Sequence, residues 1–214
     1  MKITYLSNIV NVAFKYVIDT SIKYNIDESH SLKHSMNVLQ NANNIFKSES
    51  IHKPYLNEQK DIIYVSSIIH DMCDKKYMNE LDGINEIKTH FKNFLPQDKI
   101  NIISYIISTM SYSKVKSNGF PNLGEYQTAY HIVREADLLS SYDIDRCIIY
   151  GMKRENLNYL DAIDRAKTLF NDRVLNYIKD DLFITSYSRG ESIDMHLRAL
   201  INLKNIDSLK NNIL

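Results

Sequence analysis

Apolar residues recur at helical spacing along almost the whole of this 214-residue chain, and this periodicity constrains its fold more than any other feature. No stretch alternates apolar and polar residues convincingly enough to indicate a β-strand. Only three prolines and five glycines interrupt the pattern. The sequence therefore predicts an all-α fold, a compact multi-helix bundle. The expected helices lie at about residues 3–24, 31–48, 57–72, 79–95, 98–111, 125–141, 143–155, 158–178 and 193–212.

A single domain covering residues 1–214 is expected, because a chain of this length with 44% apolar residues can bury one well-packed core. No low-complexity linker and no repeat with a period of about 20 to 50 residues divides the chain. The longest irregular stretch is expected at Ser113–Gly124, and a further turn at Ser186–Glu191. A long loop of the first kind often borders a functional site.

The composition disfavours several classes of partner. Lys and Arg together number 26, as do Asp and Glu, so no overall positive field favours a nucleic-acid polymer. No apolar run reaches the roughly 18 to 20 residues that span a bilayer, and the first residues do not resemble a signal peptide. A soluble, cytoplasmic protein with no membrane partner is expected. The abundance of Ile, Asn, Lys and Tyr indicates an AT-rich genome, such as that of a parasite or of a large DNA virus acting in host cytoplasm.

Four residues on three expected helices form the most informative motif: His34, the adjacent pair His70-Asp71, and Asp137. The pair ends the apolar segment before Met72-Cys73-Asp74, and a packed helix has no structural need for that ending. Two imidazoles and two carboxylates can hold one divalent metal ion and leave positions open for water or substrate. The alternative for Asp137 is a salt bridge to Arg134, one turn earlier.

The order of these residues, H…HD…D, resembles the HD-domain metal-dependent phosphohydrolase superfamily, in its single-domain branch. Asp74-Lys75, Ser111-Tyr112-Ser113-Lys114 and the segment 132–137 stand in the same order as in that superfamily. The resemblance covers about residues 28–150 and implies an HD-type domain. Residues from about 156 to 214 are expected to form additional helices that pack on this domain or serve in homo-oligomer formation. Asn37 and Glu135 replace an Arg and an Asp that many relatives carry.

The expected cofactor is one divalent transition metal. Mixed imidazole and carboxylate ligands suit Mn²⁺, Fe²⁺, Co²⁺, Ni²⁺ or Zn²⁺, and the sequence does not select among them. Relatives with two metals use additional histidines between the HD pair and the last Asp, where this chain offers only His90, on the flank of its helix. One metal is therefore expected, and oxygenase chemistry is not. Cys73 and Cys147 are expected to be reduced packing residues.

The resemblance implies catalytic roles for Asp74 and Lys75. Asp74 would be the general acid/base, and Lys75 would contact phosphate or orient Asp74. If the helix continued past His70, Asp74 would lie one turn beyond it and face the same cleft. The alternative is that Asp74 merely pairs with Lys75 or Lys76 at a helix end.

Three further residues are candidates for substrate binding: Arg134, Ser113 and Lys114. Arg134 precedes Asp137 by three residues and could clamp phosphate oxygens bidentately. Ser113 and Lys114 match a segment that the resemblance places near substrate. His30, one turn before His34, is expected either behind the ligands or on the surface.

Two functions from different classes follow. The first is an enzyme, a metal-dependent phosphoric ester hydrolase acting on a small phosphorylated compound, with a nucleotide as the preferred class. The second is a non-catalytic or regulatory HD module that binds a nucleotide or a partner protein. Asp74 separates them, because catalysis requires its carboxylate to face the reacting water.

Overall fold

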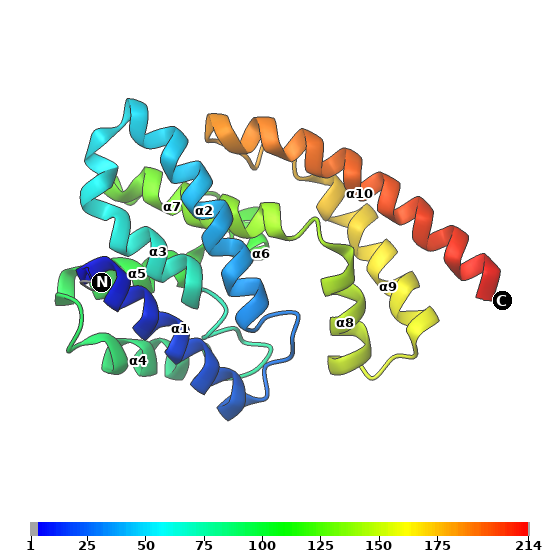
Figure 1. The fold of residues 1–214 in the computed structure, drawn as a ribbon, viewed down its shortest axis with the longest axis horizontal. Helices are drawn as coiled ribbons and strands as arrows, with labels where there is room; N and C mark the ends of the chain where they lie inside the picture. The colour runs from blue at the N-terminus through cyan, green and yellow to red at the C-terminus, as the bar shows by residue number, and fades with distance from the viewer. Residues whose placement is uncertain (1–3, 214) are drawn as a thin grey trace.

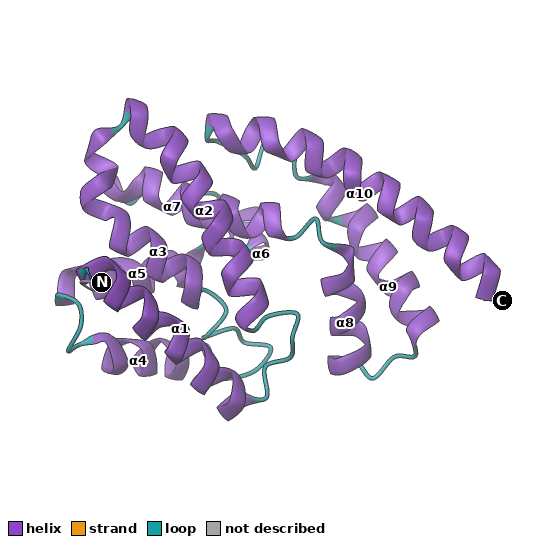
Figure 2. Ribbon diagram, in the orientation of Figure 1, coloured by secondary structure: helices purple, strands orange, loops and turns teal. Residues whose placement is uncertain are grey.

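The computed structural model describes residues 4–213, and every regular element in that range is a helix, which confirms the all-α bundle (Figure 2). Residue 3, the expected start of the first helix, lies outside the described range. The α-helices are α1 (Tyr5–Tyr24), α2 (Leu32–His52), α3 (Lys60–Ile69), α4 (Glu80–Phe91), α5 (Gln97–Thr109), α6 (Tyr112–Asn118), α7 (Gln127–Ser140), α8 (Ile144–Arg154), α9 (Tyr159–Asp172) and α10 (Ser186–Ile213). The 3₁₀ helices are η1 (Pro54–Gln59), η2 (Gly124–Tyr126) and η3 (Val174–Asn176).

Helix α3 lies at the centre of the bundle, and nine of its ten residues are buried. It packs against α1, α2, α5 and α7. Such all-round burial explains why its sequence is apolar on every side rather than on one face. Because α2, α3 and α7 pack on one another, residues far apart in the sequence meet where these helices converge.

Short polar side chains start several helices where the sequence allows a cap. Asn79 accepts hydrogen bonds from the backbone nitrogens of Leu81 and Asp82 at the start of α4, at 2.9 and 3.2 Å. Asp143 caps α8 through the nitrogen of Asp145, at 3.1 Å. These side chains satisfy N–H groups that have no partner within the helix.

The expected helix 57–72 ends earlier than predicted. Helix α3 stops at Ile69, and His70 begins a series of tight turns. The Met72 nitrogen donates to the Ile69 carbonyl at 2.9 Å, and the Asp74 nitrogen to the Asp71 carbonyl at 3.1 Å. Asp74 therefore does not lie one α-helical turn beyond His70, and its position depends on this irregular segment.

Two segments expected to be irregular contain helix. The stretch Ser113–Gly124 includes most of α6, and only its second half is a loop. Gly119 and Gly124 have positive φ angles of 73° and 56°, which explains why glycine punctuates this stretch. The turn expected at Ser186–Glu191 is the beginning of α10. The expected helix 158–178 is divided into α9 and η3.

The last three α-helices lie on one side of the bundle. Helices α8 and α9 pack closely on each other. Helix α10 begins beside α2 and α7 and then continues along α8 and α9 (Figure 1). The exposed residues of α10 include Ile193, Leu197 and Ile201, and whether they serve in self-association stays a prediction. No helix within residues 4–213 combines the length and the apolar character needed to cross a membrane.

Two buried carboxylates attach α10 to the bundle. Glu135, on α7, is fully buried and accepts hydrogen bonds from the nitrogens of Ile184 and Thr185 at 2.8 and 3.1 Å. It also accepts the Thr185 hydroxyl at 2.6 Å. Glu49, on α2, accepts the nitrogen of Ser186 at 3.1 Å. The start of α10 thus depends on charge-assisted hydrogen bonds to backbone nitrogens.

Candidate metal centre

Three helices bring His34, His70 and Asp137 together. His34 projects from the first turn of α2, His70 follows the last residue of α3, and Asp137 lies on α7. One potential ligand atom from each lies within 4.8 Å of those of the others. Both imidazoles are buried. The predicted grouping of these three residues is confirmed, and the cluster could hold a metal ion.

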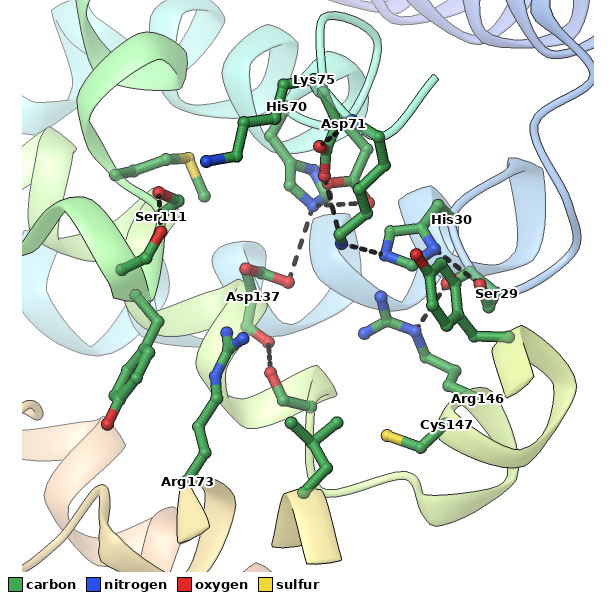
Figure 3. A pocket seen from close by; sticks show the side chains of 18 of the residues that line it. Ser29, His30, His70, Asp71, Lys75, Ser111, Asp137, Arg146, Cys147 and Arg173 are labelled. Atoms are coloured by element: carbon green, nitrogen blue, oxygen red, sulfur yellow. Dashed lines mark hydrogen bonds and ion pairs between the residues drawn. The ribbon is translucent and has the colours of Figure 1, made fainter. Parts of the chain in front are cut away.

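Asp71 completes the cluster from the turn after α3. Its Oδ2 lies 3.3 Å from the Nε2 atoms of both His34 and His70. Asp137 Oδ1 lies 3.3 and 3.6 Å from the same two nitrogens, which are themselves 3.0 Å apart. Figure 3 shows Asp137 facing the adjacent residues His70 and Asp71 from a different segment of the chain. Both carboxylates therefore place an oxygen within 3.6 Å of the two imidazole nitrogens, and Asp71 adds a fourth candidate ligand to the group of three.

The hydrogen bonding of these atoms fits a metal-binding set. His70 Nδ1 lies 3.0 Å from the Ser67 carbonyl, an acceptor, so we assign the ring proton to Nδ1. Nε2 then faces the cluster, and a metal ion bound there would take the place of the proton that the two carboxylates favour on this nitrogen. Asp71 Oδ2 is buried and makes no hydrogen bond within the described residues. A buried carboxylate oxygen without a hydrogen bond is costly, and a bound cation removes that cost.

The electrostatics of the cluster favour positive charge. Burial acts to lower the pKa of His70, but the carboxylates of Asp71 and Asp137 outweigh it and raise that pKa to about 10. Burial acts in the opposite sense on both carboxyl groups, and their contacts with the two imidazoles hold their pKa values well below the usual range. The carboxylates therefore stay charged at neutral pH and can attract a divalent cation.

A cavity of about 280 Å³ opens beside the cluster, close to the lower end of the usual range for small-molecule sites, roughly 300 to 1,000 Å³. Asp74 lines it, as expected, but both of its oxygens have partners. Oδ1 accepts the Lys76 nitrogen at 2.9 Å, and Oδ2 lies 3.2 Å from the Lys76 ammonium. Lys75 also lines the cavity and is exposed. Asp74 therefore lines the cavity, as the catalytic role requires, and also forms the ion pair with Lys76 that was the alternative to that role.

Ser113 and Lys114 line the same cavity from the first turn of α6. The Lys114 ammonium donates to the Glu80 carboxylate and, at 2.7 Å, to the Ser108 carbonyl. Its charge is therefore already compensated. Ser113 Oγ lies 3.4 Å from Ser111 Oγ, close to the cavity but weakly bonded.

Arg134 does not line the cavity, which corrects the expectation that it clamps phosphate. Its side chain is 1% exposed and donates to the Leu182 carbonyl at 2.6 Å and to Glu135 at 3.1 Å. Its guanidinium also lies 4.7 Å from the centre of the Phe120 ring. Long helical side chains lean toward the N-terminus, so Arg134 extends away from Asp137 despite the favourable spacing. The alternative Arg134–Asp137 salt bridge is likewise not formed among the described residues.

The other histidines lie in different surroundings. His30 is buried, lines the cavity and lies behind Lys76, whose ammonium is 3.0 Å from its Nε2. His90 packs on Tyr16, with ring centroids 4.6 Å apart, and does not line the cavity. Cys73 and Cys147 are free thiols, and both border the cavity.

Sequence reasoning missed three arginines that line the cavity: Arg146 on α8, Arg165 on α9, and Arg173 directly after α9. Two of them belong to the region expected to hold only additional helices. No spacing in the sequence relates them to His70 or Asp137, because their approach depends on how α8 and α9 pack.

Comparison of the chain with protein-family models and with curated proteins finds no match in either. The chemistry of the centre is therefore inferred from its own residues.

Proposed function

We propose that this chain is a metal-dependent phosphohydrolase of the HD-domain superfamily, acting on a small phosphorylated compound, with nucleotides as the preferred class. One observation carries the proposal: His34, His70 and Asp137 group their potential ligand atoms beside a small-molecule cavity, and Asp71 places an oxygen 3.3 Å from both imidazole nitrogens. This set contains no cysteine. Because structural zinc sites are typically built from cysteine ligands, the set favours a catalytic metal over a structural one.

These four residues would hold one divalent transition ion, which supplies Lewis-acid activation of water and charge neutralisation at a phosphoryl oxygen when bound. Asp74, in the adjoining cavity wall, takes a proton from the attacking water. The water oxygen forms a bond to phosphorus, the bond to the leaving oxygen breaks, and Asp74 returns the proton to that oxygen. Lys75 binds a phosphate oxygen, since its ammonium has no ion-pair partner among the described residues.

A second candidate is a regulatory module that binds a nucleotide or a partner protein without turnover. The contacts of Asp74 favour it, because the Lys76 nitrogen and ammonium occupy both carboxylate oxygens. A carboxylate whose two oxygens are both occupied is not free to contact the attacking water. The two candidates share the metal centre and differ in what Asp74 does.

Metal content tests the centre directly. The purified protein should retain about one transition-metal ion per chain, and Asp71→Ala should lose it and melt at a lower temperature. Asp98→Ala, which removes an exposed carboxylate on α5, serves as the control and should leave the metal content unchanged. Elemental analysis that finds no metal after incubation with Mn²⁺, Co²⁺ or Ni²⁺ would contradict the proposal. Unchanged metal in Asp71→Ala would remove Asp71 from the ligand set.

Turnover tests the role of Asp74. Phosphate release should be screened over nucleoside mono-, di- and triphosphates with several divalent ions. Asp74→Asn should keep its metal but lose roughly 10²- to 10⁴-fold in kcat, because the amide cannot transfer the proton. A variant that retains more than about half of the wild-type kcat would exclude the catalytic role. No release from any compound by the metal-loaded wild type would favour the regulatory module.

A further inference from the structure

Six cationic side chains line the cavity beside the metal centre, and they divide into two groups. Three have carboxylate partners: Lys76 lies 3.2 Å from Asp74, Lys114 contacts Glu80, and Arg165 makes two 2.7 Å hydrogen bonds to Glu155. The other three have no carboxylate oxygen within 4.0 Å among residues 4–213, and they are Lys75, Arg146 and Arg173.

Arg146 and Arg173 are held in place through one nitrogen each. Arg146 Nε donates to the Ser29 carbonyl at 2.7 Å, and Arg173 Nε donates to the Tyr177 hydroxyl at 3.0 Å. The Arg173 guanidinium also lies 4.4 Å from the centre of the Tyr112 ring. The terminal Nη groups of both arginines make no hydrogen bond within the described part of the chain. Two oriented guanidinium groups therefore keep their outer donors free.

These donors face the metal centre. Figure 3 shows both guanidinium groups extending from their helices toward Asp137, with Lys75 on the other side of the same space. Asp143 also borders the cavity, but its carboxylate caps α8 and forms no ion pair with either arginine. The cavity thus has one wall that binds a cation and another that carries two uncompensated positive charges.

An arginine keeps its charge at any physiological pH, and its planar donors match phosphate oxygens in pairs. Two such groups beside a partly enclosed cavity are stabilised by an anion bound between them. The metal centre would already hold the phosphoryl group that reacts. The arginines are therefore available for a different anionic group of the same ligand.

We propose that Arg146 and Arg173 bind a second phosphate group of the substrate. The cavity would then prefer compounds with two or more linked phosphates, such as nucleoside di- or triphosphates, over monophosphates. This inference rests on the proposed phosphohydrolase function and identifies the charge of its substrate. It also gives the helices after about residue 143 a part in substrate selection.

Binding of simple anions tests the proposal without turnover. Isothermal titration calorimetry on Mn²⁺-loaded protein, free of excess metal, should show pyrophosphate binding roughly 10- to 100-fold more tightly than orthophosphate, since each charge-assisted hydrogen-bond pair contributes that much. Arg146→Gln and Arg173→Gln should each remove most of this preference and change orthophosphate binding little. Arg173→Lys should be intermediate, because it keeps the charge and loses the planar fork.

Arg198→Gln is the matched control, since it removes an exposed arginine of α10 that does not line the cavity. Equal affinities for the two anions, or Arg146 and Arg173 variants that behave like the control, would overturn the proposal. Malonate binding as tight as pyrophosphate binding would overturn the assignment to phosphate. If Arg173→Gln does not fold, Arg146→Gln and Arg173→Lys decide the question.

The outcomes separate this inference from the proposed function. Selective pyrophosphate binding without any phosphate release would support the arginine site and overturn the hydrolase. Equal hydrolysis of mono-, di- and triphosphates would support the hydrolase and overturn the arginine site.

Discussion

The two walls of the cavity are built in different ways. The wall with the candidate metal ligands comes from α2, α7 and the end of α3, and nine of the ten residues of α3 are buried. The arginine wall comes from α8 and α9, in which only three of 11 and four of 14 residues are buried. Figure 1 shows these two helices to one side of the bundle. Close packing fixes the positions of the candidate metal ligands, whereas the arginine wall depends more on a few specific contacts.

This difference implies that the two walls can be perturbed separately. Substitutions inside the bundle should affect folding and the metal centre together. Substitutions in the contacts that attach the C-terminal helices should loosen the arginine wall, and how strongly they do so depends on whether the contact is buried.

The largest effect is expected for Glu135→Ala, which removes the buried carboxylate that joins α7 to the segment before α10. The change leaves the nitrogens of Ile184 and Thr185 without their acceptor, and it leaves the buried Arg134 guanidinium with the Leu182 carbonyl but no carboxylate partner. Loss of one partner of a buried pair costs about 3–5 kcal/mol of unfolding free energy. Urea denaturation should show the midpoint falling accordingly.

The control for this comparison is Lys116→Ala. Lys116 also joins the two regions, through a 2.5 Å contact with Asp180, but its ammonium is largely exposed. Its loss should not shift the urea midpoint measurably, because water screens exposed ion pairs. An unchanged midpoint for Glu135→Ala would show that the buried attachment is no stronger than the exposed one.

Two glycine-to-alanine variants, one near the metal site and one in α10, should change stability by an intermediate amount. A Cβ on Gly83 of α4 would lie 2.8 Å from Cys73 Cβ and 2.9 Å from Cys73 Cα, in the turn that follows the metal ligands. A clash with backbone costs about 1–3 kcal/mol, only partly offset by the better helix propensity of alanine. Gly83→Ala should therefore lower the melting temperature and weaken metal binding.

Gly190→Ala is the matching change in α10, where an added Cβ meets no heavy atom within 4 Å. It should raise the unfolding free energy by about 0.5–1 kcal/mol, because alanine favours helix. Thermal melts of both variants under the same conditions provide the measurement. Destabilisation by Gly190→Ala would mean that α10 is covered by contacts absent from this structure.

A pH dependence is expected from His131, which lies next to the attachment point on α7 and changes stability only at acidic pH. Burial, assisted by the charges of Arg134 and Lys53, lowers the pKa of His131 to about 4. In the unfolded chain His131 has an ordinary pKa near 6.5. Between about pH 6.5 and pH 4 it is therefore protonated in the unfolded chain and neutral in the folded chain. Stability from this group is therefore full above about pH 6.5 and falls as the pH drops toward 4, by on the order of 1–2 kcal/mol after allowance for solvent screening.

Denaturation of His131→Gln across the same pH range isolates this contribution, because glutamine does not titrate. The variant should lose less stability than wild type between pH 6.5 and 4. Parallel pH curves for the two proteins would show that the proton on His131 is not excluded by the fold.

The helical class was predictable because apolar periodicity is a local property, and the structure confirms it. The meeting of His34, His70 and Asp137 was predictable through the pattern of ligand-type residues, and it too is confirmed. Helix ends were less predictable. The early stop of α3 at Ile69 depends on turns in which the chain leaves the α-helical hydrogen-bond pattern, and the residue types alone do not indicate this.

The sequence by itself determined the all-α class, because apolar spacing is a property of each helix, and it indicated the candidate metal ligands, because His and Asp are the residue types that bind such ions. Only the tertiary structure decided what Arg134, Arg146 and Arg173 do. Arg134 turned inward to Glu135 and Leu182, while the other two came to the cavity from helices with no sequence relation to the metal ligands. The direction of a long side chain is decided by the charges and carbonyls that packing brings near it, and those partners lie far away along the chain.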